Sequence, residues 1–447
     1  MLYRLFLFIV AALVAESCSV ESVPENNQNS ETLKLVSGPM PGHSAMREAK
    51  VWLQLNNAAE VYIKYREHDA ENAHFIQSRP VTTQYKYGFT ATLTADSLEP
   101  GRTYAYKVVI NGKEADTPPL YFQSQKLWQH REEPPDWSFA AGSCAFINEE
   151  EYDRPGEPYG RNYGIFEAIR KSSPEMFLWL GDNVYLREAD YDSRSGFIKR
   201  YSHVRALPEL QKMLSGMHHY AIWDDHDYGP NDADKSYVFK NTSLDIFRSF
   251  WPNPGFGFQD EDAAATAFHW NDCLFVLADN RFFRASNNRS TGSRDYLGDK
   301  QLEWIIDVLK SSNASFKFVA VGGQVLNTAK VYENYANYPE ERKKLLQRIT
   351  DEQIKNVVFL TGDRHKTELS EYDAGSFKIR DLTCSPLTSK AYNSVNENNR
   401  LRVEGTHVAE QNFAKISLSG TRAERQLHMQ IFNAKGEQEW ERLILRE

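Results

Sequence analysis

Four apolar segments of the 447-residue chain each end in a short polar motif that carries possible metal ligands. In chain order the motifs are GSC (142–144), GDNVY (181–185), WDDHD (223–227) and GDRH (362–365). Carboxylates, imidazoles, a thiolate and a phenolate are the donors that a metal centre needs. Ligands bind outside the carboxyl ends of the strands in open α/β sheets, so the four motifs are expected to meet at one sheet edge.

Each residue taken alone also has an ordinary structural explanation. Cys144 is typical of a buried structural cysteine, Asp182 of a turn or helix cap, and Tyr185 of core packing with a hydrogen-bonded hydroxyl. Asp224 is expected to orient a neighbouring ligand, and Asp227 to be solvated. The ordered set of motifs, rather than any single member, therefore indicates a metal centre.

The segments between the motifs alternate between strand-like and helix-like patterns from Trp137 onward. This alternation predicts a layered α/β domain over residues 137–447. Residues 31–130 instead hold short alternating runs separated by turn signals, which is typical of an antiparallel β-sandwich. The stretch SLEPGRTYAYKVVING resembles the tyrosine-corner region of immunoglobulin-like and fibronectin-like modules. The patterns together predict a two-domain α/β (α+β) protein.

The first 17 residues have one arginine, an apolar stretch of signal-peptide length and small residues before Cys18. They predict a secretory signal rather than a spanning helix. Cys18 resembles the lipidation cysteine of bacterial lipoproteins, and simple secretion is the alternative. Residues 18–30 are polar and predict a tether. Export to the periplasm or the cell surface, with a lipid anchor at Cys18, is the expected location.

The composition narrows the classes of partner. Hydrophobic residues make up 41% of the chain and aromatic residues 13%, which fits a globular protein. The formal net charge of −9 disfavours general binding to nucleic acid. A membrane is expected to be reached only through the N-terminal anchor, and the oligomeric state stays open.

Taken in order, GSC, GDNVY, WDDHD and GDRH resemble the alkaline phosphatase D (PhoD) family of metallophosphoesterases, which shares a metal frame with calcineurin-like enzymes and purple acid phosphatases. The resemblance covers nearly the whole mature chain and implies a layered αββα catalytic domain. It also implies hydrolysis of a phosphomonoester or phosphodiester by water activated at a two-metal centre. A phospholipase-like phosphodiesterase and a non-catalytic cell-surface binding protein are the alternatives.

The resemblance implies six metal ligands: Cys144, Asp182, Tyr185, Asp225, Asp363 and His365. In this assignment Cys144, Tyr185 and His365 hold a ferric ion, and Asp182 bridges to a second ion held by Asp225 and Asp363. His226 faces the phosphate as general acid or transition-state donor. Asn231 reaches the substrate or the second metal, and Arg364 is either a phosphate clamp or a surface ion-pair residue.

Two residues depart from the pattern of calcineurin-like relatives. Gln324 stands where those relatives supply a histidine, and Asp363 takes the first place of a motif that often has two histidines. More oxygen donors imply a harder second metal, such as calcium. The resemblance therefore implies Fe³⁺ and Ca²⁺ as cofactors and a phosphate ester as substrate.

Overall fold

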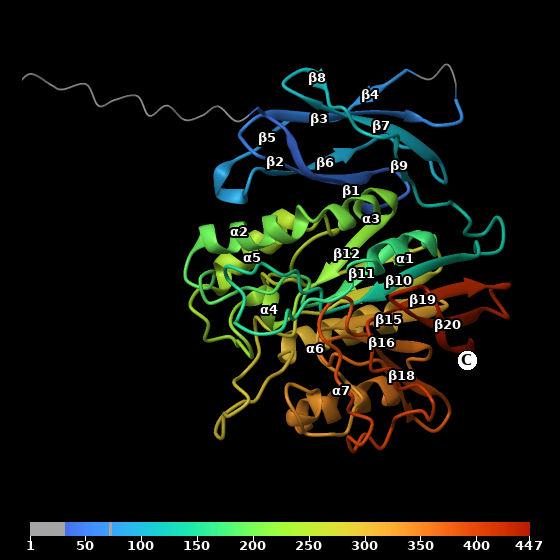
Figure 1. Cartoon of the computed structure of the whole chain (residues 1–447). Helices are drawn as coiled ribbons and strands as arrows, with labels where there is room; N and C mark the ends of the chain where they lie inside the picture. Colours follow the sequence, from blue (N-terminus) through green and yellow to red (C-terminus); the bar gives the residue numbers. More distant parts are fainter. Residues whose placement is uncertain (1–31, 71–73) are drawn as a thin grey trace, which may run out of the picture. The chain divides into compact units, whose positions relative to one another are not determined.

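The segments that follow Trp137 form two six-stranded β-sheets in the computed structural model, which describes residues 32–70 and 74–447. The first sheet has the order β12-β11-β10-β19-β20-β21, and the second has the order β13-β14-β15-β16-β18-β17 (Figure 1). The strands of the first sheet are β10 (Trp137–Gly142), β11 (Met176–Leu180), β12 (His218–Ile222), β19 (Asn412–Ser419), β20 (Gln426–Asn433) and β21 (Gln438–Leu445). The strands of the second are β13 (Thr266–Trp270), β14 (Cys273–Leu277), β15 (Phe316–Val321), β16 (Val357–Thr361), β17 (Glu368–Asp373) and β18 (Lys378–Thr383).

Helices cover the outer face of each sheet. The helices are α1 (Ile165–Lys171), α2 (Arg194–Arg205), α3 (Pro208–Gly216), α4 (Asp225–Tyr228), α5 (Lys240–Phe250), α6 (Asp299–Ser311) and α7 (Pro339–Asp351). One apolar core joins the first sheet to α1, α2, α3 and α5, and another joins the second sheet to α6 and α7. A third core, with Phe139, Leu178 and Phe318, lies between the two sheets. The expected α/β fold with an αββα layer order is therefore confirmed.

The N-terminal strands form two smaller antiparallel sheets. One has the order β1-β2-β6, and the other has the order β4-β3-β7-β8, with β5 on β3 and β9 on β7. Their bounds are β1 (Leu35–Ser44), β2 (Ala49–Leu55), β3 (Glu60–Glu67), β4 (Ile76–Gln77), β5 (Val81–Thr82), β6 (Thr90–Ala95), β7 (Thr103–Ile110), β8 (Lys113–Glu114) and β9 (Leu120–Gln123). Short 3₁₀ turns cover Tyr85–Tyr87 and Tyr335–Asn337. Residues Lys34–Glu447 form one compact unit, and the boundary between the two predicted domains stays a prediction.

The predicted signal segment, Cys18 and the tether lie outside the described residues. Among the described helices, none is long and apolar enough to cross a lipid bilayer.

His218, the first residue of β12, connects the first six-stranded sheet to the N-terminal strands. Its Nδ1 lies 2.7 Å from the carbonyl oxygen of Gly42 in β1, and its Nε2 accepts a hydrogen bond of 3.2 Å from the backbone N–H of Gln123 in β9. An imidazole that donates through one nitrogen and accepts through the other must be neutral. Burial lowers the pKa of His218 to about 4.

We expect stability to fall on acidification partly through His218. The unfolded chain binds this proton near pH 6.5 and the folded chain only near pH 4, so the folded state loses stability as the pH falls from about 6.5 to 4. One proton corresponds to about 1.4 kcal/mol per pH unit. In the variant His218→Gln, the glutamine side chain can still donate and accept a hydrogen bond, but it does not titrate. Its urea-unfolding free energy should depend less steeply on pH, whereas the exposed-site variant His130→Gln should match the wild-type slope; equal slopes for His218→Gln and wild type would refute this role.

Candidate metal centre

The four predicted motifs meet where the two sheets face each other. β10, β11 and β12 run parallel, so Cys144, Asp182 and Asp225 follow the carboxyl ends of adjacent strands. Asp363 and His365 follow β16 of the second sheet. Gly362 permits this approach, because a Cβ at that position would lie 2.6 Å from the Cβ of Ser143. The fold thus brings the predicted ligands together from two facing sheets, and the expectation that all four motifs lie at one sheet edge is wrong for GDRH.

The first group of donor atoms contains a thiol, a carboxylate and an imidazole. Ligand atoms of Cys144, Asp182 and His365 all lie within 4.8 Å of one another. The hydroxyl of Tyr185 donates a 3.1 Å hydrogen bond to Oδ2 of Asp182 and also lies 3.1 Å from Nε2 of His365. The four predicted first-site side chains are therefore adjacent, as one ion would require.

His365 is fixed in the tautomer that a metal ligand needs. Its Nδ1 lies 2.7 Å from the carbonyl oxygen of Lys390, so Nδ1 carries the proton and Nε2 faces Tyr185 with a free lone pair. Burial lowers the pKa of His365 to about 4, which keeps the ring neutral.

The second group contains Asp182, Asp225 and His226, whose ligand atoms also lie within 4.8 Å of one another. Asp182 belongs to both groups, as expected for a bridging carboxylate. Three buried atoms here have no hydrogen-bond partner among the described residues: Oδ1 of Asp225, Oδ2 of Asp363 and Nδ1 of His226. Buried polar atoms are normally paired, so these orphans fit a bound ion or substrate.

The charges of the site also call for a cation. Burial, and then the carboxylate of Asp225, raise the pKa of Asp182 well above its usual range. Burial and the neighbouring Asp182 raise the pKa values of the Cys144 thiol and the Tyr185 phenol. Adjacent buried acids cannot all ionise without a compensating positive charge. The donor set and the mutual repulsion of these buried acidic groups therefore fit a metal centre.

A third acidic group is already neutralised by the protein. Ligand atoms of Asp224, Asp225 and Glu333 lie together, but Nε of Arg281 donates to Asp224 at 2.5 Å and its Nη1 donates to Glu333 at 2.9 Å. Arg284 pairs with the same Glu333 at 2.8 Å. The guanidinium of Arg281 therefore serves as the cation of this group, and Asp224 is a partner of Arg281.

Four of the predicted ligands have a left-handed backbone. The φ angles are 62° at Cys144, 52° at Asp182, 68° at Asp363 and 50° at His365. Side chains disfavour this region, and such residues persist where the surrounding structure holds them. The backbone N–H of Cys144 donates to the carbonyl oxygen of Gly181, and that of His365 donates to Oγ of Ser385 at 2.9 Å.

One expectation about WDDHD is wrong. Asp227 was expected to be solvated, yet it is fully buried. Its Oδ2 accepts a 3.0 Å hydrogen bond from the backbone N–H of Asp224, and its Oδ1 accepts one of 3.1 Å from that of Asn183. The carboxylate caps α4 and ties the GDNVY turn to WDDHD, so it is structural.

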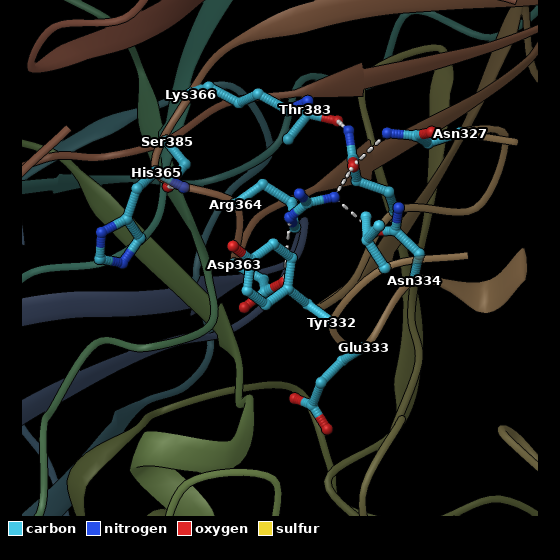
Figure 2. A network of polar contacts seen from close by, with 12 residues as sticks. Asn327, Tyr332, Glu333, Asn334, Asp363, Arg364, His365, Lys366, Thr383 and Ser385 are labelled. Carbon is cyan, nitrogen blue, oxygen red and sulfur yellow. Dashed lines mark hydrogen bonds and ion pairs between the residues drawn. The ribbon is translucent and has the colours of Figure 1, made fainter. Parts of the chain in front are cut away.

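Arg364 lies in a buried polar network rather than on the surface, so the surface ion-pair alternative is wrong (Figure 2). Its Nη1 donates to Gln324 at 2.8 Å and to Asn334 at 2.9 Å, and its Nη2 donates to Glu397 at 2.6 Å. Its Nε lies 3.8 Å from Oδ2 of Asp363. Gln324, at the position where relatives supply histidine, therefore orients Arg364. The phosphate-clamp role stays a prediction.

Asn231 has no contact in the described structure that supports a role at the site. It is exposed in the turn after α4. The next residue, Asp232, donates its backbone N–H to Oδ2 of Asp225 at 2.8 Å. The predicted substrate or metal contact of Asn231 stays a prediction.

Several residues of the site carry no motif in the sequence. Oγ of Ser385 lies 3.1 Å from Sγ of Cys144, and Oγ of Ser389 donates to the Tyr185 hydroxyl at 3.2 Å. Glu333 and Arg281 form the neutralised acidic group. These residues come from segments far apart in the chain, and no motif in the sequence marks them.

Comparison with known proteins gives a consistent result. Residues 139–430 match the family model of PhoD-like phosphatases, and residues 32–124 match a domain of unknown function, DUF7800. Alkaline phosphatase D of Bacillus subtilis (strain 168) is 21% identical over 341 residues, which cover 64% of this chain and 55% of that protein. The chain thus aligns with just over half the length of this curated relative.

Two solved structures share the fold across most of the chain. A structure of PhoD superposes with a TM-score of 0.72 at 15% identity and covers 91% of each chain. A purple acid phosphatase from yellow lupin (Lupinus luteus) seeds superposes with a TM-score of 0.67 at 12% identity, over 92% of this chain and 74% of that one.

Proposed function

Because the chain belongs to the PhoD-like phosphatase family, we propose that it is a metal-dependent phosphoester hydrolase whose two ions share Asp182. The observation that carries the proposal is the pair of donor groups with this one carboxylate in common. Thiolate, phenolate and imidazole donors in the first group favour Fe³⁺, and the carboxylates of the second favour the harder Ca²⁺.

Two ions held by these residues would neutralise the phosphoryl oxygens and lower the pKa of the attacking water. Asp182, Asp225 and Asp363 hold the positive charge where the phosphate binds. His226, whose Nδ1 has no partner, would act as a hydrogen-bond donor to the developing charge or as a general acid. As a general acid, the protonated ring would give one proton to the oxygen that leaves as the P–O bond breaks, and the proton released by the attacking water would restore the balance. No side-chain nucleophile is required, since Cys144 lies among the metal donors.

Phosphomonoesters and phosphodiesters both remain substrates of this proposal. A phospholipase-like diesterase would use the same residues. A non-catalytic binding protein would have no need of the donor groups, and family membership supports an enzyme. Rates of hydrolysis measured on a panel of phosphomonoesters and a panel of phosphodiesters would show which class is preferred.

We expect chelation to abolish hydrolysis and readdition of iron and calcium to restore it. Aryl monoesters and diesters serve as substrates, and metal content is measured on the same samples by mass spectrometry. Far-ultraviolet circular dichroism before and after chelation controls for unfolding. Full activity in folded, metal-free protein would contradict the proposal.

A further inference from the structure

Tyr332 lies at the surface and is followed in the chain by two buried residues that are held by hydrogen bonds. It is 77% exposed, whereas Glu333 and Asn334 are fully buried. Glu333 pairs with Arg281, and Asn334 accepts a hydrogen bond from Arg364. The carbonyl oxygen of Tyr332 accepts a 2.7 Å hydrogen bond from Nδ2 of Asn337. The backbone of Tyr332 is therefore held in place by its neighbours, although the side chain buries little surface itself.

The backbone of Tyr332 is also left-handed, with φ of 46°. A bulky residue in this region is uncommon and is strained. Folding gains little from the exposed ring in return. A strained, exposed aromatic residue beside a catalytic centre indicates a binding role.

The ring of Tyr332 lies against the guanidinium of Arg364, with Cζ 4.9 Å from the ring centroid. Figure 2 shows the ring beside Arg364 and Asp363. Nε of Arg364 in turn lies 3.8 Å from the Asp363 carboxylate. A group attached to a phosphate at the metal centre is thus within reach of the ring.

We propose that Tyr332 forms a stacking subsite for a planar aromatic group of the substrate, such as the aryl or nucleobase part of a phosphate ester. This inference rests on the proposed function and adds the class of ester. Arg364 lies over the ring, and the residue is nevertheless 77% exposed, so most of its surface is open to solvent. Base–aromatic stacking is tolerant of sequence and substituent, because every base has a π-face.

The cation on the inner face favours an aromatic partner over a sugar or alkyl group. A guanidinium draws the negative quadrupole of the ring toward itself. The outer face is then less negative, which weakens contacts with C–H groups and favours offset stacking with an electron-rich ring. A phosphate ester with only an aliphatic or sugar group would gain little from Tyr332.

The test measures binding of non-hydrolysable probes to the metal-loaded protein by isothermal titration calorimetry. Phenylphosphonate and methylphosphonate share the phosphonate and differ in the ring. We expect wild-type protein to bind phenylphosphonate about tenfold more tightly than methylphosphonate, the effect of one stacked ring. Tyr332→Ala should abolish this preference, and Tyr332→Phe should retain it.

Tyr85 supplies the matched control, since it is an exposed tyrosine (71%) in the 3₁₀ turn of the N-terminal region. Tyr85→Ala should keep the wild-type preference. Equal binding of the two probes by wild type, or an unchanged preference in Tyr332→Ala, would overturn the subsite while leaving hydrolysis intact. Absence of binding for both probes would overturn the phosphate site, and the subsite with it.

Discussion

Asp182→Asn should lower turnover by about 10³-fold or more and reduce the content of both metals. Charge stabilisation by bound ions is worth several kcal/mol in the transition state, and both donor groups depend on this carboxylate. Asparagine keeps the shape and the hydrogen bond from Tyr185 but removes the charge. Turnover and metal content are measured on the same preparation.

Asp272→Asn provides the control for loss of a buried carboxylate. Asp272 is fully paired with Arg425, at 2.9 and 3.0 Å, and belongs to neither donor group. Its replacement should lower the melting temperature but leave metal content unchanged. Normal metal content in Asp182→Asn would show that Asp182 is not the shared ligand.

The second large effect concerns His226. We expect His226→Ala to keep both metals and to lose about 10²–10⁴-fold in turnover, with the larger loss for poor leaving groups, as for a general acid. The ring of His226 packs against that of Tyr185, with a centroid separation of 4.3 Å and a tilt of 30°, so it is already oriented in the site. Turnover of esters with a graded series of leaving-group pKa values measures this role.

The rival role makes His226 a metal ligand, and its ligand atom does lie within 4.8 Å of those of Asp182 and Asp225. Loss of one metal from His226→Ala would establish that role instead. His219→Gln is the control for a buried histidine, since His219 accepts a 3.1 Å hydrogen bond from Trp179 and lies outside the donor groups. It should lose stability and keep turnover.

The layered fold could be predicted because its signals are local. Apolar strands such as MFLWL end at glycine, and α6 and α7 have an apolar face of helical period. β1 was not predicted, because its sequence LVSGPMPGHS contains two prolines and two glycines, which argue against a strand. In the structure β1 pairs with β2 through irregular register shifts that accommodate them.

The residues of the candidate site can likewise be divided into those that the sequence predicted and those that it did not. Ligands that directly follow strands were predicted from their motifs. Arg281 and Ser385 also follow strands, β14 and β18, but their side chains are not typical metal donors, and Glu333 comes from a loop whose position only tertiary packing decides. Asp227 was misassigned for a related reason. Its capping partners, the backbone N–H groups of Asp224 and Asn183, belong partly to another strand end, and no sequence pattern shows that approach.

The left-handed backbone at Cys144, Asp182, Asp363 and His365 limits how far the protein can be stabilised by mutation without losing activity. Glycine would relax each of these four positions, so each is a site where the chain forgoes stability to present a side chain. Selection for heat resistance alone would therefore favour glycine there and would remove the metal donors. At these four positions the requirements of stability and activity therefore conflict.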